Sequence, residues 1–139
     1  MRRRITKEKA MDNNEKTTLV KPRRDEAARL FRRYARLGLD RTALSVFDIY
    51  GRIRGVAKDE DVALRLLGVY DMMRLLAITD EESARAVRAV YFADRGRLPA
   101  KNQTSERILR FATENHLDER TVYRRLRAAK ELYYRLIQQ

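Results

Sequence analysis

The sequence predicts an all-α protein, folded as a helical bundle, from three observations. The chain of 139 residues contains only five Gly and two Pro, so few residues interrupt helix formation. Apolar residues recur at spacings of three and four, which is the period of one helix face, and the alternating runs typical of strands are absent. Hydrophobic residues make up 44% of the chain, which is enough to fill a core beneath these faces.

Six helices follow from this spacing and from the residues that start or end each one. The expected ranges are about 22–37, 40–55, 59–78, 79–95, 104–115 and 118–139. Pro22 suits the first turn of the first helix, and Gly38 is expected to end that helix. Asp40 is the expected cap of the second helix.

The third helix, at residues 59–78, has the widest apolar surface in the chain. Its apolar residues step by four and three in a heptad pattern, and acids fill its first turn, where the helix dipole favours them. The heptad positions are Val62, Leu66, Val69, Met73 and Leu76. We therefore expect this helix either at the centre of the bundle or at an interface between two copies of the chain.

Short capping patterns delimit the last three helices. Thr79 and Glu82 form the sequence pattern of a capping box, with Thr79 as the expected cap of the fourth helix. A loop that contains Pro99 separates the fourth helix from the fifth. His116 lies in a tight turn, where it is interpreted as a helix-ending residue or a phosphate contact, and Asp118 caps the last helix.

The organisation expected from the charge distribution has three parts. Residues 1–22 are polar and lack periodicity, which predicts a disordered basic tail. Residues 23–78 are expected to form an N-terminal helical region for packing or dimerisation, and residues 79–139 a helix-turn-helix region that binds DNA. The net charge is +12, and the positive excess lies at the two ends of the chain.

Composition excludes several classes of protein and favours a polyanionic partner. Of the 32 basic residues 25 are Arg, whose forked guanidinium groups suit phosphate or guanine better than general solubility requires. The chain has no Cys and one His, which excludes disulfide scaffolds, thiolate zinc sites and multi-His metal sites. No catalytic motif stands out, so neither an enzyme nor a cofactor is expected. Without an apolar span or a secretory signal, a cytoplasmic protein with no membrane partner is expected.

The most specific pattern runs from residue 105 to residue 137. A short helix, a tight turn and a longer helix are typical of a helix-turn-helix, whose second helix buries one stripe and offers its opposite face to the major groove. The expected buried stripe is Val122, Leu126, Ala129, Tyr133 and Leu136. The exposed faces carry Arg and Thr side chains, which can pair with base edges or phosphate. The candidate DNA-binding residues of this helix are Arg120, Thr121, Arg124, Arg125 and Arg127.

Residues 84–137 resemble region four of bacterial sigma factors in the segments RAVRAVYF, ERILRFA and LDERTVYRRLRAAKELYYRL. They are more similar still to small phage regulators of the ArpU and RinA type, which are sigma-like activators of late genes. The resemblance implies double-stranded DNA and RNA polymerase as partners, and it places Lys101 and Arg107 at backbone-contacting positions. The chain has no Trp and no counterpart of the promoter-melting region of sigma factors. The resemblance therefore implies an activator rather than a complete sigma factor.

The expected function is that of a sequence-specific double-stranded DNA-binding activator of the phage late-gene type. Two alternatives stay open. The small subunit of a phage DNA-packaging terminase also joins a helix-turn-helix to an oligomerising helical region, and an RNA-binding or antitermination factor would also use an Arg-rich helix. Because dimers commonly read operators and the third helix is so apolar, a homodimer is a further hypothesis.

Overall fold

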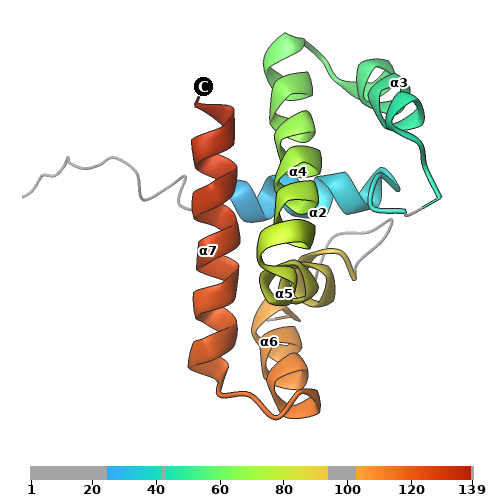
Figure 1. Cartoon of the computed structure of the whole chain (residues 1–139). Coiled ribbons are helices and arrows are strands. Elements are labelled where there is room, and N and C mark those ends of the chain that lie inside the picture. The colour runs from blue at the N-terminus through green and yellow to red at the C-terminus, as the bar shows by residue number, and fades with distance from the viewer. Residues whose placement is uncertain (1–24, 42, 94–102, 139) are drawn as a thin grey trace, which may run out of the picture.

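The computed structural model describes residues 25–41, 43–93 and 103–138, and these residues form six helices joined by short connections (Figure 1). The helices are α2 (Glu26–Arg36), α3 (Val46–Val56), α4 (Glu60–Thr79), α5 (Glu81–Tyr91), α6 (Gln103–Glu114) and α7 (Glu119–Ile137). No strand occurs in this part of the chain, so the all-α prediction is confirmed. The expected tail, residues 1–22, lies outside the described residues. Among the described helices, none has the length and hydropathy needed to cross a bilayer.

The two longest helices, α4 and α7, lie side by side and run in opposite directions (Figure 1). Helix α2 crosses behind them, α5 and α6 pack around the end of α4 and the start of α7, and α3 packs on the first part of α4. Helix α4 contacts α2, α3, α5 and α7, and its heptad residues are buried or half-buried by these contacts. Of the two places expected for this helix, the structure shows the centre of the bundle.

A glycine permits the close crossing of α4 and α7. A Cβ atom at Gly68 would lie 2.5 Å from Ile137 Cγ2 and 3.2 Å from Tyr133 Cε1, so no larger residue fits unless these side chains of α7 shift. Tyr133 is completely buried there, and its ring meets that of Phe31 edge to face at 5.5 Å between centroids. Phe31 in turn meets Tyr91 at 5.7 Å. These three rings join α7, α2 and α5 in one core.

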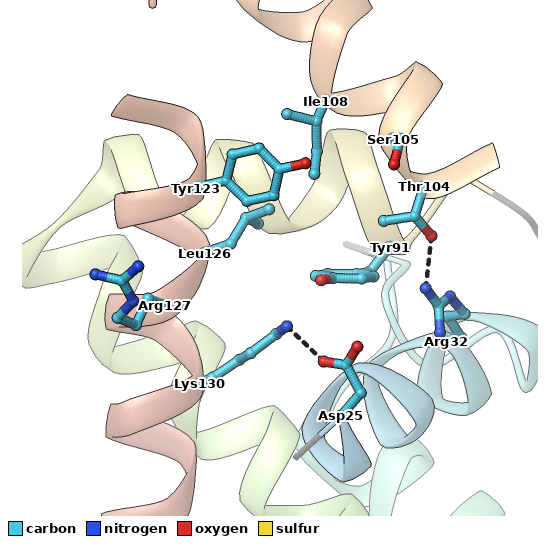
Figure 2. Close-up of a pocket in the computed structure, with 10 residues that line it drawn as sticks. All are labelled: Asp25, Arg32, Tyr91, Thr104, Ser105, Ile108, Tyr123, Leu126, Arg127 and Lys130. Carbon is cyan, nitrogen blue, oxygen red and sulfur yellow. Dashed lines mark hydrogen bonds and ion pairs between the residues drawn. The ribbon is translucent and has the colours of Figure 1, made fainter. Parts of the chain in front are cut away.

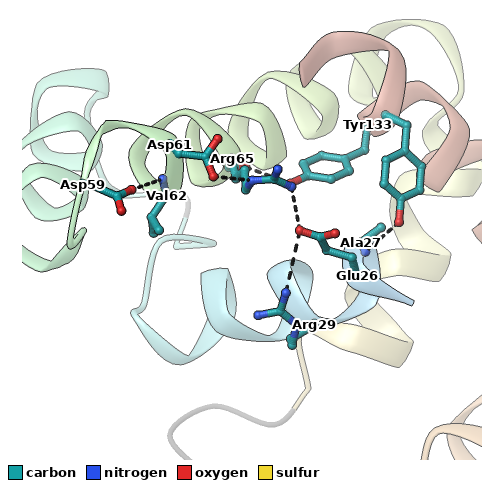
Figure 3. Close-up of polar contacts among 9 residues, drawn as sticks. Glu26, Ala27, Arg29, Asp59, Asp61, Val62, Arg65 and Tyr133 are labelled. Atoms are coloured by element: carbon teal, nitrogen blue, oxygen red, sulfur yellow. Dashed lines mark hydrogen bonds and ion pairs between the residues drawn. The ribbon is translucent and has the colours of Figure 1, made fainter. Parts of the chain in front are cut away.

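An ion-pair network fastens α2 to α4 (Figure 3). Arg65 Nη1 lies 2.6 Å from a carboxylate oxygen of Glu26, and Arg65 Nε lies 2.9 Å from one of Asp61. The hydrogen bond to Asp61 raises the pKa of Arg65, and Glu26 adds to this effect, whereas partial burial opposes it. Arg65 therefore stays charged while its partners hold the start of α2 against α4.

The two adjacent tyrosines of α7, Tyr133 and Tyr134, both make hydrogen bonds to other helices of the bundle. Tyr133 is buried, and its hydroxyl donates to the Arg65 carbonyl at 3.3 Å. Tyr134 is half-buried, and its hydroxyl accepts a hydrogen bond of 3.1 Å from the Ala27 amide in the first turn of α2. Such first-turn amides have no partner within their own helix, so Tyr134 supplies one from α7.

The second helix begins later than expected, and Asp40 is not its cap. Gly38 has a φ of 75° and ends α2, as expected, and the buried Leu39 then donates its amide to the Tyr34 carbonyl at 3.1 Å. Because Leu39 is drawn into the core, the chain turns at Asp40 instead of restarting a helix there. Helix α3 begins at Val46, after Ser45 forms a reciprocal capping box with Asp48.

The cap of α5 is Asp80, so the prediction that Thr79 caps this helix is wrong. The Asp80 carboxylate accepts hydrogen bonds from the Ser83 amide at 3.2 Å and from the Ser83 hydroxyl at 2.6 Å. Thr79 is the last residue of α4, and its hydroxyl donates to the Leu75 carbonyl at 2.8 Å. Because α4 continues through Thr79, Asp80 is the first residue with a non-helical backbone, and its carboxylate supplies the cap.

Candidate nucleic-acid interface

A tight turn of defined geometry joins α6 to α7. His116 has a φ of 56°, the left-handed conformation, and its amide donates to the Thr113 carbonyl at 3.3 Å. The amide of Leu117 donates to the Ala112 carbonyl at 2.8 Å. This pair of bonds is a Schellman motif, which satisfies carbonyl groups at the end of α6. The interpretation of His116 as a helix-ending residue is therefore confirmed.

Asp118 then starts α7, as the sequence predicts. Its carboxylate accepts a hydrogen bond of 2.9 Å from the Arg120 amide, and its backbone is extended. The two helices thus leave the turn at an angle fixed by a left-handed residue and a side-chain cap (Figure 1). The first turns of α7 lie directly after this rigid connection.

Replacing His116 by glycine is expected to increase the free energy of unfolding by about 0.5–1 kcal/mol, because glycine adopts positive φ without a Cβ clash. The measurement is urea unfolding followed by circular dichroism. His116→Ala is the matched control, and it should bring no gain because alanine keeps the Cβ atom. A loss of stability in His116→Gly would instead show that the imidazole contributes more than the backbone strain costs.

The inward face of α7 agrees with the expected stripe. Val122, Leu126, Ala129 and Tyr133 are buried, and Leu136 is half-buried. On the opposite side, the exposed residues of the first turns follow the helix at spacings of four and three. They are Arg120, Arg124 and Arg127, which we call the arginine stripe.

The arginine stripe carries three cationic groups that no carboxylate neutralises within the described part of the chain. Arg124 Nη2 donates to the hydroxyl of the half-buried Thr121 at 3.1 Å, which orients this guanidinium group. Thr121 thus lies at the edge of the stripe, as a neighbour of its central member. All four of these residues are therefore brought together on one side of α7.

The other predicted site residues lie elsewhere. Arg125 is turned toward α5, where its guanidinium group pairs with Glu82 at 3.1 Å. Arg107 donates to the Val90 carbonyl at 3.4 Å, near the end of α5. Lys101 lies outside the described residues. Arg107 and Arg125 thus tie α6 and α7 to α5, and their contacts with DNA stay predictions.

The structure also forms a basic pocket that the sequence did not indicate (Figure 2). Its volume is about 420 Å³, and its walls come from the start of α2, the end of α5, the start of α6 and the middle of α7. The polar and aromatic residues that we use to define the basic pocket are Asp25, Arg32, Tyr91, Thr104, Ser105, Arg127 and Lys130. These residues are spread over four segments, so no local spacing could have revealed them.

Comparison with known proteins identifies no relative of this chain: no family model, curated protein or solved structure matches it. The class of protein is therefore inferred from the arginine stripe, from the turn that positions the stripe and from the net charge of the chain. The resemblance of residues 84–137 to phage late-gene regulators remains an expectation from the sequence.

Proposed function

We propose that this chain is a sequence-specific double-stranded DNA-binding protein that acts as a transcriptional activator of the phage late-gene type. In this proposal α6 and α7 are the helix-turn-helix, α7 enters the major groove, and the protein performs no chemistry itself. The observation that carries the proposal is the arginine stripe. Three exposed Arg residues without acidic partners among the described residues lie on the outward face of a helix that follows a rigid turn.

The dimensions of the stripe support this assignment. Arg120 and Arg127 are seven residues apart, so they are separated by about 10 Å along the helix axis at a rise of about 1.5 Å per residue. A single α-helix fits the major groove, which is about 12 Å wide, and Arg is the side chain that most often pairs with guanine there. The stripe could therefore contact bases on successive pairs while basic residues at its edges contact phosphates.

The net charge of +12 supports the same partner by a different argument. A chain with this excess attracts any polyanion through counterion release, and this attraction alone carries no sequence information. Specificity has to come from groups that reach base edges. The proposal assigns that role to the arginine stripe and leaves the general attraction to the rest of the basic residues.

The test is selection of bound fragments from a genomic library, followed by salt titration of the best fragment. Wild type is expected to select one discrete motif, and Arg124→Ala should flatten the preference at one or two base positions by about 1–3 kcal/mol. Arg54→Ala is the matched control. It removes the same charge from α3, where Arg54 is exposed and paired with Glu60.

The same experiment separates the proposal from its alternatives. Uniform binding with a steep salt dependence and no motif would mean that the positive charge attracts DNA only through counterion release, without sequence specificity. Stronger binding to hairpin RNA at matched salt would select the RNA-binding alternative, and a ring of many subunits on the DNA would select the packaging subunit. A motif located in promoters would support the activator and make RNA polymerase the next partner to test.

We further propose that the protein binds its site as a homodimer, and the structure changes where such a contact would lie. The heptad positions of α4 are buried or half-buried inside the bundle, so they are not the free apolar face that the sequence suggested. Among the described residues, the most exposed large apolar side chains are Phe47 on α3, at 84%, and Ile78 at the end of α4, at 79%. Sedimentation of the DNA complex tells whether one or two copies bind.

A further inference from the structure

The basic pocket is positively charged, and contacts within the fold do not occupy all of its hydrogen-bond donors. Among the described residues that line it, Arg32, Arg127 and Lys130 are cationic and Asp25 is the one acidic residue. Arg32 Nη2 donates to the Thr104 hydroxyl at 2.6 Å, and Lys130 Nζ lies 2.8 Å from Asp25 (Figure 2). Asp25 thus pairs with one of the three cations, and the described lining keeps an excess of positive charge.

Arg32 is held in an unusual way for a charged side chain. Its guanidinium group lies over the ring of Tyr91, with 5.1 Å from Cζ to the ring centroid, and Lys130 Nζ lies 5.2 Å from the same centroid. The Nε atom of Arg32 is buried and has no hydrogen-bond partner among the described residues. A buried donor without a partner is costly, and an acceptor supplied by a water or a bound ion is one explanation for such a group.

Lys130 keeps its charge in this place. Burial lowers the pKa of Lys130, but Tyr91 and Asp25 outweigh burial, and the net direction is upward from the ordinary value. The ammonium group is therefore protonated at neutral pH. It has three N–H donors, of which Asp25 uses one and the side chain of Tyr91 is a second partner.

The first turn of α6 completes the pocket with groups that favour an anion. Thr104 and Ser105 lie in this turn, and both border the cavity. Hydroxyl groups donate to oxyanions, and the amides and dipole of a helix N-terminus favour negative charge. Forked guanidinium, ammonium and hydroxyl donors around one cavity are the set that a phosphate group accepts from.

We propose that the basic pocket binds a phosphate group through Arg32, Lys130 and the first turn of α6. Two sources share this chemistry: a free phosphorylated small molecule, and a phosphodiester of the nucleic acid. Because inorganic phosphate is a probe for both, the inference can be tested without DNA and does not depend on the proposed function.

The first arm titrates inorganic phosphate into the full-length protein by calorimetry, with sodium chloride at matched ionic strength as the reference. Wild type is expected to bind phosphate, and Arg32→Gln should weaken this binding at least about ten-fold, since a charge-assisted hydrogen bond is lost. Arg54→Gln, on α3, is the matched control and should bind like wild type. Circular dichroism checks that each variant is folded.

A second variant keeps the test decisive if Arg32→Gln does not fold. Ser105 is exposed and makes no hydrogen bond through its side chain within the described residues, so Ser105→Ala should leave the fold intact. It is expected to weaken phosphate binding about three-fold, because loss of a neutral hydrogen bond lowers the binding free energy by about 0.6 kcal/mol. Wild type that binds phosphate no better than chloride would overturn the proposal.

The second arm measures duplex DNA binding by the variant Arg32→Gln. If the source is the DNA backbone, this variant loses affinity for all duplexes equally, the salt slope falls by about one, and phosphate competes with DNA. If the source is a free phosphorylated molecule, DNA binding is unchanged while phosphate binding is lost. A failure of the arginine stripe to select a motif would leave the phosphate result intact, so the two proposals fail separately.

Discussion

Removal of the whole arginine stripe, in Arg120→Ala/Arg124→Ala/Arg127→Ala, is expected to weaken binding to the preferred duplex about thousand-fold, since each base contact is worth about 1–3 kcal/mol. The three guanidinium groups lie on one face of α7 without acidic partners in the described structure. Fluorescence anisotropy with a labelled duplex that carries the selected motif measures this loss. The same titration against a scrambled duplex should show that most of the preference has disappeared.

The comparison between the two duplexes decides what the stripe does. If the stripe reads bases, the loss is much larger on the motif than on the scrambled duplex, because only the motif offers matched base edges. An equal loss on both duplexes would mean that these residues contact only phosphates. The variant Arg29→Ala/Arg52→Ala/Arg54→Ala removes the same charge from exposed positions on α2 and α3. It should keep the preference for the motif.

Tyr133→Ala is expected to lower the free energy of unfolding by about 3–5 kcal/mol, the usual cost of deleting a large buried aromatic side chain. Tyr133 has no exposed surface, and its ring fills the space between Phe31 and Gly68. Its loss would leave a cavity where α7 meets both α4 and α2. Urea unfolding followed by circular dichroism measures the effect.

The matched control is Tyr133→Phe, which keeps the ring and removes only the hydroxyl group. This variant loses the hydrogen bond to the Arg65 carbonyl, so a cost of about 1 kcal/mol is expected. If Tyr133→Ala cost no more than Tyr133→Phe, the ring would not be the element that joins α7 to the rest of the bundle. Because the start of the same helix carries the arginine stripe, DNA binding should be measured only on variants that remain folded.

Local pattern alone was enough to predict the parts of this protein that depend on neighbouring residues in the chain. The period of the apolar residues determined that the described chain is helical and that Val122, Leu126 and Ala129 face inward on α7. Asp118 as a cap and His116 as a helix end were predictable for the same reason, because each acts on residues within a few positions of itself. In these places no distant contact opposed the local preference.

Two caps were mispredicted because two suitable residues lay close together. Asp40 and Ser45 are both good N-caps, and the burial of Leu39 decided between them. Thr79 and Asp80 are likewise both good caps, and the continuation of α4 through Thr79 left the role to Asp80. In both places the cap was selected by how the neighbouring residues pack in the fold, and local sequence patterns do not contain that information.

The arrangement of the basic residues was decided by tertiary structure. Arg124 and Arg125 are adjacent and identical in type, but one helical step of about 100° turns Arg124 outward and Arg125 toward Glu82 on α5. The basic pocket depends even more on the fold, because Arg32 and Lys130 are brought to the same Tyr91 ring from α2 and α7. The sequence by itself determined an all-helical, strongly basic chain with a short helix, a turn and a long helix at its end. Only the packing of the helices decided which cations remain exposed and which surround a common cavity, since that choice depends on contacts between residues far apart in the chain.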